Sequence, residues 1–362
     1  RLLLSSILLA TCALVLFQGC RGSARPAATP SDVVGVRTVT PLTPAQARAA
    51  WSQAREVLET RCVVCHGCYD APCQLKLGSF EGIDRGGSEA KVYDASRLAE
   101  MEPTRLFIDA HGAVQWRTKG FHPVLADDPA DPRTGVLARM LDLKASHPLL
   151  SSHDIGKEFT LDLDRKQTCT DGEHFEKYAS DHPLWGMPYA LPALNDGERA
   201  SVVDWVRAGA PHDDPPPLAA KTASAVEEWE GFLNDTQPKS RLAARYIYEH
   251  LFLASFYFEG DDEPTYFRLV RSRTPLGAVD EIATRRPFDD PKTERVYYRF
   301  VRRDERSLAK TQMPYALSPA RLGLYRRLFI EADYRVDRLP TYEPDVASNP
   351  FRAFEAIPAR SR

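Results

Sequence analysis

Apolar residues gather at the start of the chain. Residues 2–17 form an apolar run broken only by serine and threonine, too short for a transmembrane helix of about 20 residues. That length suits the apolar core of a signal peptide, which we expect over residues 1–20. Gly19-Cys20 also offers a lipoprotein cleavage site with Cys20 as lipid acceptor, although plain export is favoured. Residues 21–42, rich in proline, alanine, threonine and serine, are the expected linker.

Two amphipathic helices with clear N-terminal caps follow. Thr43 is a good N-cap, Pro44 suits the first helical position, and residues 45–60 are good helix formers. Asn195 caps a second pattern with apolar residues at helical spacing, which predicts a helix over residues 196–208. Val202, Val203, Trp205 and Val206 supply the apolar face of this second helix.

Elsewhere the pattern of apolar positions changes. Apolar and polar residues alternate over residues 105–109, which predicts a strand. His111-Gly112 suits a two-residue turn, and residues 114–117 would form the second strand of a β-hairpin. Residues 243–258 are largely apolar and aromatic, and the simplest interpretation is one buried helix. Residues 319–330 again show a helical pattern. These segments predict helices mixed with short hairpins.

Composition narrows the class of protein. Of the 362 residues, 43% are hydrophobic and 27% are charged, which is typical of a globular protein and excludes a polytopic membrane protein. The 47 basic and 50 acidic side chains give a net charge of -3, whereas nucleic-acid binders usually carry a basic excess. We therefore expect no nucleic-acid partner.

The first predicted helix runs into Cys62-Val63-Val64-Cys65-His66. C-x-x-C-H is the attachment pattern for c-type haem. Its two thiols reach the two vinyl groups of one porphyrin, and the adjacent histidine places a ring nitrogen on the iron. The motif predicts one covalent haem c, with Cys62 and Cys65 as thioether anchors and His66 as proximal ligand. Because c-type haem is attached outside the cytoplasm, the export signal supports this interpretation.

The same segment permits a rival interpretation. Cys62, Cys65, Cys68 and Cys73 are spaced much like the thiolates of an iron–sulfur cluster, and four thiolates also hold zinc. Export to an oxidising compartment, and a last spacing that is one residue too long, favour haem. Cys68, Cys73 and Cys169 then remain, enough for one disulfide and one free thiol. The sequence does not choose the pair, and Cys68–Cys73 is the most local option.

A second axial ligand is expected among the methionines. Met187 has the best context, because it stands in a Met-Pro loop just before the second capped helix. Methionine ligation typically raises the reduction potential of a haem. Plain core packing is the alternative role for Met187. Met313, which opens a second copy of the pentapeptide Met-Pro-Tyr-Ala-Leu, and His182 are the alternative ligands.

These motifs stand in the order of a cytochrome c domain: helix, C-x-x-C-H, Met-Pro loop and closing helix. We expect a fold that is mainly α with short β hairpins. A cytochrome c-like haem domain with a long insertion is expected over residues 43–212, and a mixed α+β second domain over residues 223–362. The proline-rich residues 213–222 are the expected linker between them.

The second domain carries candidate substrate residues. If residues 243–258 do more than fill a core, Tyr246 and Phe252 are candidates to line an acyl-chain site or to touch a bilayer surface. Arg285 and Arg286 lie in a locally basic stretch and are candidates to meet phosphate or carboxylate groups. Met313, the runner-up axial ligand, is also a candidate substrate contact.

Several segments resemble the bacterial fatty acid cis/trans isomerases. Residues 61–76, which contain the C-x-x-C-H motif, resemble the haem-binding segment of that family. The resemblance spans roughly residues 45–340, so it does not depend on the haem motif alone. The other segments that carry it are residues 103–107, 244–252, 271–274, 283–287 and 310–317. Family chains run well beyond this length, so we expect this chain to be an N-terminal portion.

The resemblance implies a periplasmic haem enzyme of Gram-negative bacteria. Such an enzyme converts cis double bonds to trans in membrane phospholipids and free unsaturated fatty acids, and it uses neither ATP nor a nicotinamide. Ferric haem withdraws electron density from the alkene, the weakened bond rotates, and the electron returns. The resemblance also implies peripheral contact with the membrane, and the haem implies loading by the cytochrome c maturation machinery.

A periplasmic c-type electron carrier fused to a partner-binding domain is the competing function. An electron carrier needs an exposed haem edge and no long apolar groove. An isomerase needs a channel for an acyl chain that ends at the haem, with basic groups near its mouth. The second domain therefore discriminates between the two functions.

Overall fold

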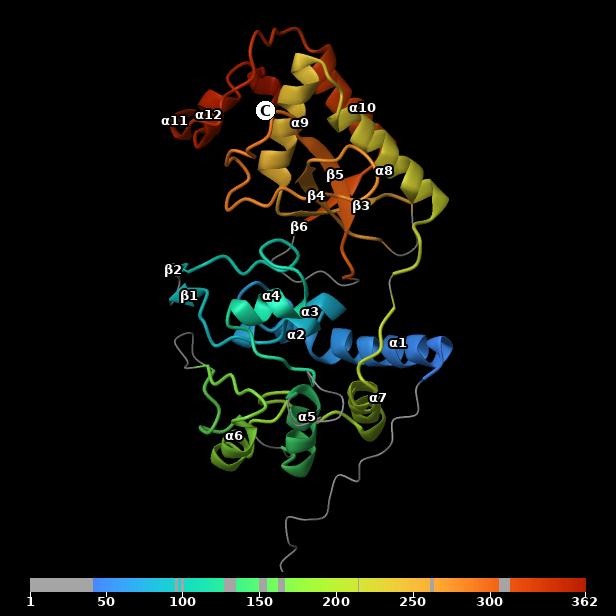
Figure 1. Ribbon diagram of the computed structural model, residues 1–362, viewed down its shortest axis with the longest axis vertical. Helices are drawn as coiled ribbons and strands as arrows, with labels where there is room; N and C mark the ends of the chain where they lie inside the picture. The colour runs from blue at the N-terminus through green and yellow to red at the C-terminus, as the bar shows by residue number, and fades with distance from the viewer. Residues whose placement is uncertain are drawn as a thin grey trace, which may run out of the picture. The chain divides into compact units, whose positions relative to one another are not determined.

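The computed structural model describes residues 42–94, 97–98, 101–126, 135–149, 155–161, 167–213, 215–260, 264–305 and 313–362 (Figure 1). The expected signal peptide, Cys20 and nearly all of the first expected linker lie outside the described residues. Helices and one small mixed sheet make this an α+β protein, as expected for its second half.

Helix α1, Pro44–Arg61, begins where the sequence predicts it. The Thr43 side chain accepts a hydrogen bond from the Gln46 backbone N–H, and the Gln46 side chain accepts one from the Thr43 N–H. This capping box satisfies two backbone donors that the first helical turn would otherwise leave without partners. The apolar face of the helix buries residues that include Trp51 and Leu58.

Helix α7, Asp196–Arg207, confirms the second capped helix. Asn195 and Glu198 form its capping box, and Val202, Val203 and Trp205 are buried. The helix packs against α1, where the rings of Trp51 and Trp205 lie 5.1 Å apart. The two capped helices therefore form one core contact.

A core that we call the Trp205 cluster occupies this part of the chain. The other elements here are α2 (Val63–His66), a 3-10 helix (Pro72–Gln74), α3 (Phe80–Arg85), β1 (Tyr93–Asp94), β2 (Arg97–Leu98), α4 (Gly112–Thr118), α5 (Leu137–Ser146) and α6 (Phe175–Asp181). Buried members of the cluster include Trp51, Leu58, Leu77, Ile83, Met140, Leu141, Phe175, Tyr178, Val202 and Trp205.

The hairpin predicted around His111-Gly112 is wrong. Residues 106–108 form a turn, and α4 occupies the predicted return strand. The Asp109 carboxylate accepts the Arg105 backbone N–H at 2.6 Å and also pairs with its guanidinium. Such local bonds between side chain and backbone compete with a strand ladder. Trp116 then packs on Phe121 in a small core of its own.

A mixed four-stranded sheet forms the second part of the chain. Its strands are β3 (Ala254–Phe258), β4 (Phe267–Ser272), β5 (Tyr297–Arg302) and β6 (Met313–Leu317), in the spatial order β5-β4-β3-β6. Strand β6 runs parallel to β3, and the other two pairs are antiparallel. In the register of the sheet, Phe256 of β3 lies opposite Phe267 of β4 and opposite Tyr315 of β6.

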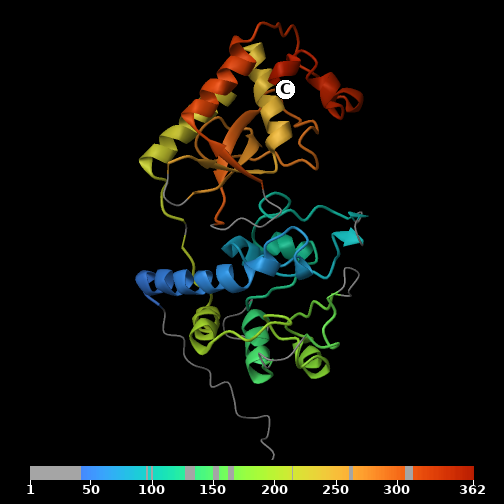
Figure 2. The same cartoon turned by 180° about the vertical axis from the view of Figure 1, so that it is seen from behind.

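Helices cover the sheet and close a second core, the Phe256 cluster (Figures 1 and 2). They are α8 (Ala220–Leu233), α9 (Pro238–Leu251) and α10 (Pro319–Tyr325), which continues as a π-helical turn over Arg326–Glu331. The short helices α11 (Pro344–Ala347) and α12 (Pro350–Ala353), and a 3-10 helix at Ala359–Ser361, follow. The cluster includes Trp229, Ile247, Phe256, Phe267, Phe300, Leu317, Phe329 and Phe354.

The single helix predicted over residues 243–258 is also wrong. Helix α9 ends at Leu251, and strand β3 begins at Ala254. The residues of β3 are aromatic or small, and they pair with strands from two later parts of the chain. Pairing with distant strands decides this segment, because a run of apolar residues alone does not distinguish a strand from a buried helix. The helix predicted over residues 319–330 is confirmed, with the π-helical end described above.

Hydrogen bonds connect the elements around the two cores. Arg55 of α1 donates to the Asp304 carboxylate just after β5, at 3.0 Å. Arg268 of β4 donates to the Phe107 carbonyl at 3.1 Å, and Arg105 donates to the Thr284 carbonyl at 2.9 Å. Among the described residues, no helix is both long and apolar enough to cross a membrane.

A disulfide joins Cys73 to Cys169 and leaves Cys68 as a buried free thiol. The most local option, Cys68–Cys73, is therefore not the pair that forms. The bond joins residues 96 positions apart, and it ties the segment after the C-x-x-C-H motif to the segment before α6. A cross-link that closes so long a loop strongly restricts the unfolded chain.

We expect the double variant Cys73→Ser/Cys169→Ser to lose about 2–5 kcal/mol of its free energy of unfolding, because the unfolded chain regains the freedom of that loop. Urea denaturation followed by circular dichroism measures the loss. Reductant should lower the midpoint of the unmodified protein and leave that of the double variant unchanged. Equal reductant sensitivity of the two proteins would contradict the assignment.

Candidate functional site

The C-x-x-C-H motif forms a turn of helix directly after α1. The N–H groups of Cys65 and His66 donate to the Cys62 carbonyl at 3.1 and 2.9 Å. Residues three positions apart on a helix share one face, so the Cys62 and Cys65 thiols lie on the same side. Cys62 is half-buried and Cys65 is exposed. This spacing suits two thioether bonds to one flat ring.

His66 is buried and has a fixed orientation. Its Nδ1 lies 3.2 Å from the Leu75 carbonyl oxygen. A carbonyl only accepts, so Nδ1 carries the proton and Nε2 holds the free electron pair. Burial lowers the pKa of His66 to about 4, which keeps the imidazole neutral at neutral pH. A neutral imidazole whose other nitrogen donates to a backbone carbonyl is the usual form of a metal-ligating histidine.

The four-cysteine interpretation fits the structure less well. Cys73 is in a disulfide, so it offers no thiolate beside Cys62, Cys65 and Cys68. Burial raises the pKa of the Cys62 thiol to about 11, so without a bound group this thiol is protonated at neutral pH. Among the described residues, no group of three or more histidine, cysteine, aspartate or glutamate side chains is arranged to hold a metal ion. The residues present fit a haem bound through two thioethers.

Met187 borders the same hydrophobic core as Cys62. Both side chains pack against the Trp205 cluster, and the Met187 N–H donates to the Met140 carbonyl of α5 at 3.0 Å. His182 stacks on Trp185 with ring centroids 3.9 Å apart. Met313 instead opens β6 opposite Ala254, with 43% of its surface exposed. The tertiary structure thus brings Met187 and Cys62 to one core and keeps Met313 on the sheet.

Apart from Met313, the candidate substrate residues lie in two separate places. Tyr246 packs against Phe329 and Phe354, and Phe252 borders the same Phe256 cluster. Arg285 accepts a hydrogen bond from Arg105 through its carbonyl oxygen. Arg286 forms an ion pair with Asp289 at 2.8 Å. The aromatic pair belongs to the core and the arginine pair to a loop.

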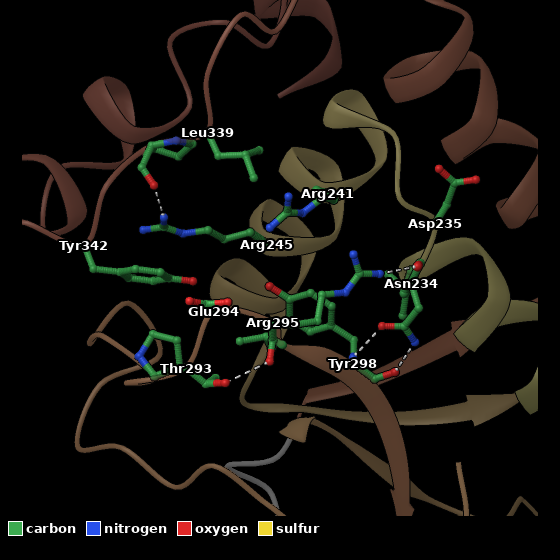
Figure 3. Close-up of a pocket in the computed structure, with 14 residues that line it drawn as sticks. Asn234, Asp235, Arg241, Arg245, Thr293, Glu294, Arg295, Tyr298, Leu339 and Tyr342 are labelled. Carbon is green, nitrogen blue, oxygen red and sulfur yellow. Dashed lines mark hydrogen bonds between the residues drawn. The ribbon is translucent and has the colours of Figure 1, made fainter. Parts of the chain in front are cut away.

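A small pocket of mixed character that the sequence analysis did not find lies beside α9 (Figure 3). Its volume is about 100 Å³, and Arg241, Arg245, Arg295 and Tyr342 are among its lining residues. The Arg245 guanidinium lies 3.9 Å from the centre of the Tyr342 ring and pairs with Glu249. The sequence signal for this pocket is the spacing of Arg241 and Arg245, four positions apart on one helix.

A larger pocket of about 610 Å³ lies next to the disulfide, at Cys169. Cys169, His122, His174 and His182 are among its lining residues, together with several acidic side chains. Of the residues predicted to form the site, only His182 lines either of these two pockets. Both linings mix charged and aromatic groups, and neither is the long apolar groove expected for an acyl chain.

Charged residues that directly follow strand β5 lie close to the segment after the C-x-x-C-H motif. Glu305 is buried just after β5, where it pairs with Arg303. A Cβ on Gly78 would lie 3.8 Å from both Glu305 and Val63, so these two side chains flank one point of the backbone. Burial lowers the pKa of Lys76 to about 8, and the Glu305 carboxylate opposes that shift. The second half of the chain therefore contributes charge close to the motif.

Comparison with known protein families places this chain beside one of them. The family model of fatty acid cis/trans isomerases matches residues 101–362. The match begins after the C-x-x-C-H motif, so it is independent of Cys62, Cys65 and His66. A search of curated proteins found no match. A search of solved structures found none either.

The lowered pKa of Lys76 predicts a rise in stability at alkaline pH. The folded protein releases this proton near pH 8, whereas the unfolded chain holds it until about pH 10.5, so raising the pH through that window favours the folded state. The expected gain is about 1 kcal/mol per pH unit. Urea midpoints at both ends of the window should show this gain in the unmodified protein and not in Lys76→Met. The same gain in both proteins would show that Lys76 is not its source.

Proposed function

The chain belongs to the fatty acid cis/trans isomerase family and is an isomerase, and we propose that it converts cis acyl double bonds to trans with the help of one covalent haem c. The family match over residues 101–362 is the observation that carries the reaction class. The haem is our inference from Cys62, Cys65 and His66, which precede the matched region. Membrane phospholipids and free cis-unsaturated fatty acids are the proposed substrates.

The proposed haem site uses residues of α1 and α2. Cys62 and Cys65 would form the thioether bonds, and His66 would ligate the iron through Nε2, the nitrogen that the bond to Leu75 leaves free. When bound, ferric haem supplies an electron-withdrawing group that weakens a nearby double bond enough for it to rotate. The remaining tasks of the protein are to orient His66, to exclude water from the site and to hold the acyl chain.

Met187 is the proposed second axial ligand. Its support is a position on the Trp205 cluster, which also borders Cys62. A thioether at that position would raise the reduction potential, which suits electron withdrawal. It would also occupy the iron, so the double bond would be polarised from outside the coordination sphere unless Met187 withdraws. Met313 and His182 remain the alternative ligands.

The proposed compartment is the periplasm of a Gram-negative bacterium. A disulfide between Cys73 and Cys169 is the kind of bond that persists in oxidising compartments. A C-x-x-C-H haem would be attached there by the cytochrome c maturation machinery. Substrates that reside in a bilayer would require peripheral contact with the membrane surface.

We expect the haem-loaded protein to form trans acyl chains from vesicles of a cis-monounsaturated phosphatidylcholine without added ATP or nicotinamide. Gas chromatography of the fatty acid methyl esters measures the product. Cys65→Ser should lose at least one thioether bond and most of the activity, and its exposed position makes a folding defect less of a concern.

Cys68→Ser is the matched control, because Cys68 is the remaining free thiol of the same segment. It should keep both the covalent haem and the activity. Full isomerase activity in a haem-free Cys65→Ser protein would refute the haem-dependent reaction. A haem-loaded protein that exchanges electrons but forms no trans product would favour the electron carrier.

Met187→Ala should lower the reduction potential and change the visible spectrum of the ferric protein, because a sulfur ligand stabilises the reduced iron. Potentiometric titration with optical detection measures both. Met313→Ala should leave both unchanged. The reverse pattern would assign the ligand to Met313, and no change in either variant would exclude both methionines.

A further inference from the structure

The backbone just after the haem motif adopts an unusual conformation. Cys73 and Gln74 have φ values of 55° and 49°, in the left-handed region, and neither residue is glycine. Non-glycine residues adopt this conformation when the surrounding structure holds them there, and such positions gather at functional sites. The segment Cys73–Leu75, which we call the carbonyl segment, ends at the residue whose carbonyl accepts from His66.

Cys73 is held at three points. Its side chain forms the disulfide with Cys169, and its N–H donates to the Gln167 side chain at 2.6 Å. Its carbonyl accepts the Ser88 N–H at 2.7 Å. Two separate parts of the chain, residues 167–169 and Ser88, therefore fix this one residue.

Gln74 is buried, and both ends of its amide have partners. Its Nε2 donates to the Ala90 carbonyl at 2.8 Å, and its Oε1 accepts from the Thr104 hydroxyl at 2.7 Å. The side chain is only 3% exposed, so these bonds have little competition from solvent. The Gln74 side chain thus fastens the carbonyl segment to two loops of the insertion.

Arg85 holds the backbone of the same residue. Its guanidinium donates through Nη2 to the Gln74 carbonyl and through Nη1 to the Thr104 carbonyl, the latter at 3.0 Å. It is 1% exposed, and its guanidinium packs against the rings of Trp116 and Phe121, at 5.4 and 4.9 Å from their centres. A planar guanidinium bonded at two points and covered by two rings has little freedom to move.

The carbonyl segment in turn meets His66. The Leu75 carbonyl oxygen lies 3.2 Å from His66 Nδ1, and the Leu77 N–H donates to the His66 carbonyl at 2.9 Å. An imidazole that donates a well-aligned hydrogen bond is a stronger ligand with a fixed ring orientation. Whatever holds Leu75 therefore sets both properties of His66.

We propose that Arg85 and Thr104, with the Cys73–Cys169 disulfide, are positioning elements that hold the Leu75 carbonyl against His66 and so set the orientation and donor strength of that ligand. This inference rests on the proposed haem site. None of these residues touches the reacting atoms. They act through Gln74 and Leu75. Arg85 lies at the end of α3, and Thr104 lies in the loop before α4.

The test uses the haem-loaded protein and two matched pairs of variants. Thr104→Val removes the hydroxyl that donates a hydrogen bond to Gln74 Oε1 and keeps the side-chain shape. Thr104→Ser keeps the hydroxyl. Arg85→Lys keeps the charge and loses the two-point bond. Arg271→Lys is its control, because Arg271 is equally buried and also bonded at two points, to Asp289 and Thr284.

Reduction potential and the electron paramagnetic resonance g values of the ferric haem are the readouts. Thr104→Val and Arg85→Lys should shift the potential upward and change the g values, because a less well-aligned hydrogen bond makes His66 a weaker donor. Thr104→Ser and Arg271→Lys should match the unmodified protein. A loss of stability alone would move none of these values in the folded, haem-loaded fraction.

Unchanged potentials and g values in Thr104→Val would overturn the positioning role, even if Arg85→Lys failed to fold. A shift in Arg271→Lys as large as that in Arg85→Lys would overturn it as well. Absence of covalent haem from the unmodified protein would instead refute the proposed haem site, so the two failures are distinguishable.

Discussion

The hydrogen bond from His66 to the Leu75 carbonyl is the interaction on which the candidate site depends. It fixes which nitrogen of the imidazole carries the proton, and so which one is free to ligate a metal. The bond joins a short helix to Leu75, which directly follows two residues in left-handed conformation, and buried side chains and a disulfide hold those two residues. The orientation of the His66 ring therefore depends on contacts from distant segments, among them Ser88, Thr104 and Cys169.

The two cores have different tasks around this bond. The Trp205 cluster supports α1, the cysteine motif and Met187, so it positions the groups that would hold a haem. The Phe256 cluster supports a sheet from which Glu305 extends toward the motif. The family match covers all of this sheet and none of the cysteine motif. The proposed haem ligands and the matched region therefore come from different parts of the chain, and they approach each other near Lys76.

Both pockets described above mix charged and aromatic lining groups, which bears on how an acyl chain would approach. A chain of methylene groups is favoured by apolar walls, because water released from such walls drives its binding. The aromatic residues expected to line a groove, Tyr246 and Phe252, pack into the Phe256 cluster instead. In the described part of the chain, these side chains stabilise the second core.

The sequence by itself determined the features that depend on near neighbours. The capping boxes at Thr43 and Asn195 and the helical turn through Cys62 and Cys65 all arise from residues within four positions of each other. The tertiary structure decided what depends on distant partners. Cys169 is the disulfide partner of Cys73, residues 254–258 form a strand, and the buried Arg85 donates to the Gln74 carbonyl. Spacing and propensity report on short segments, whereas these contacts form only when segments far apart in sequence pack together.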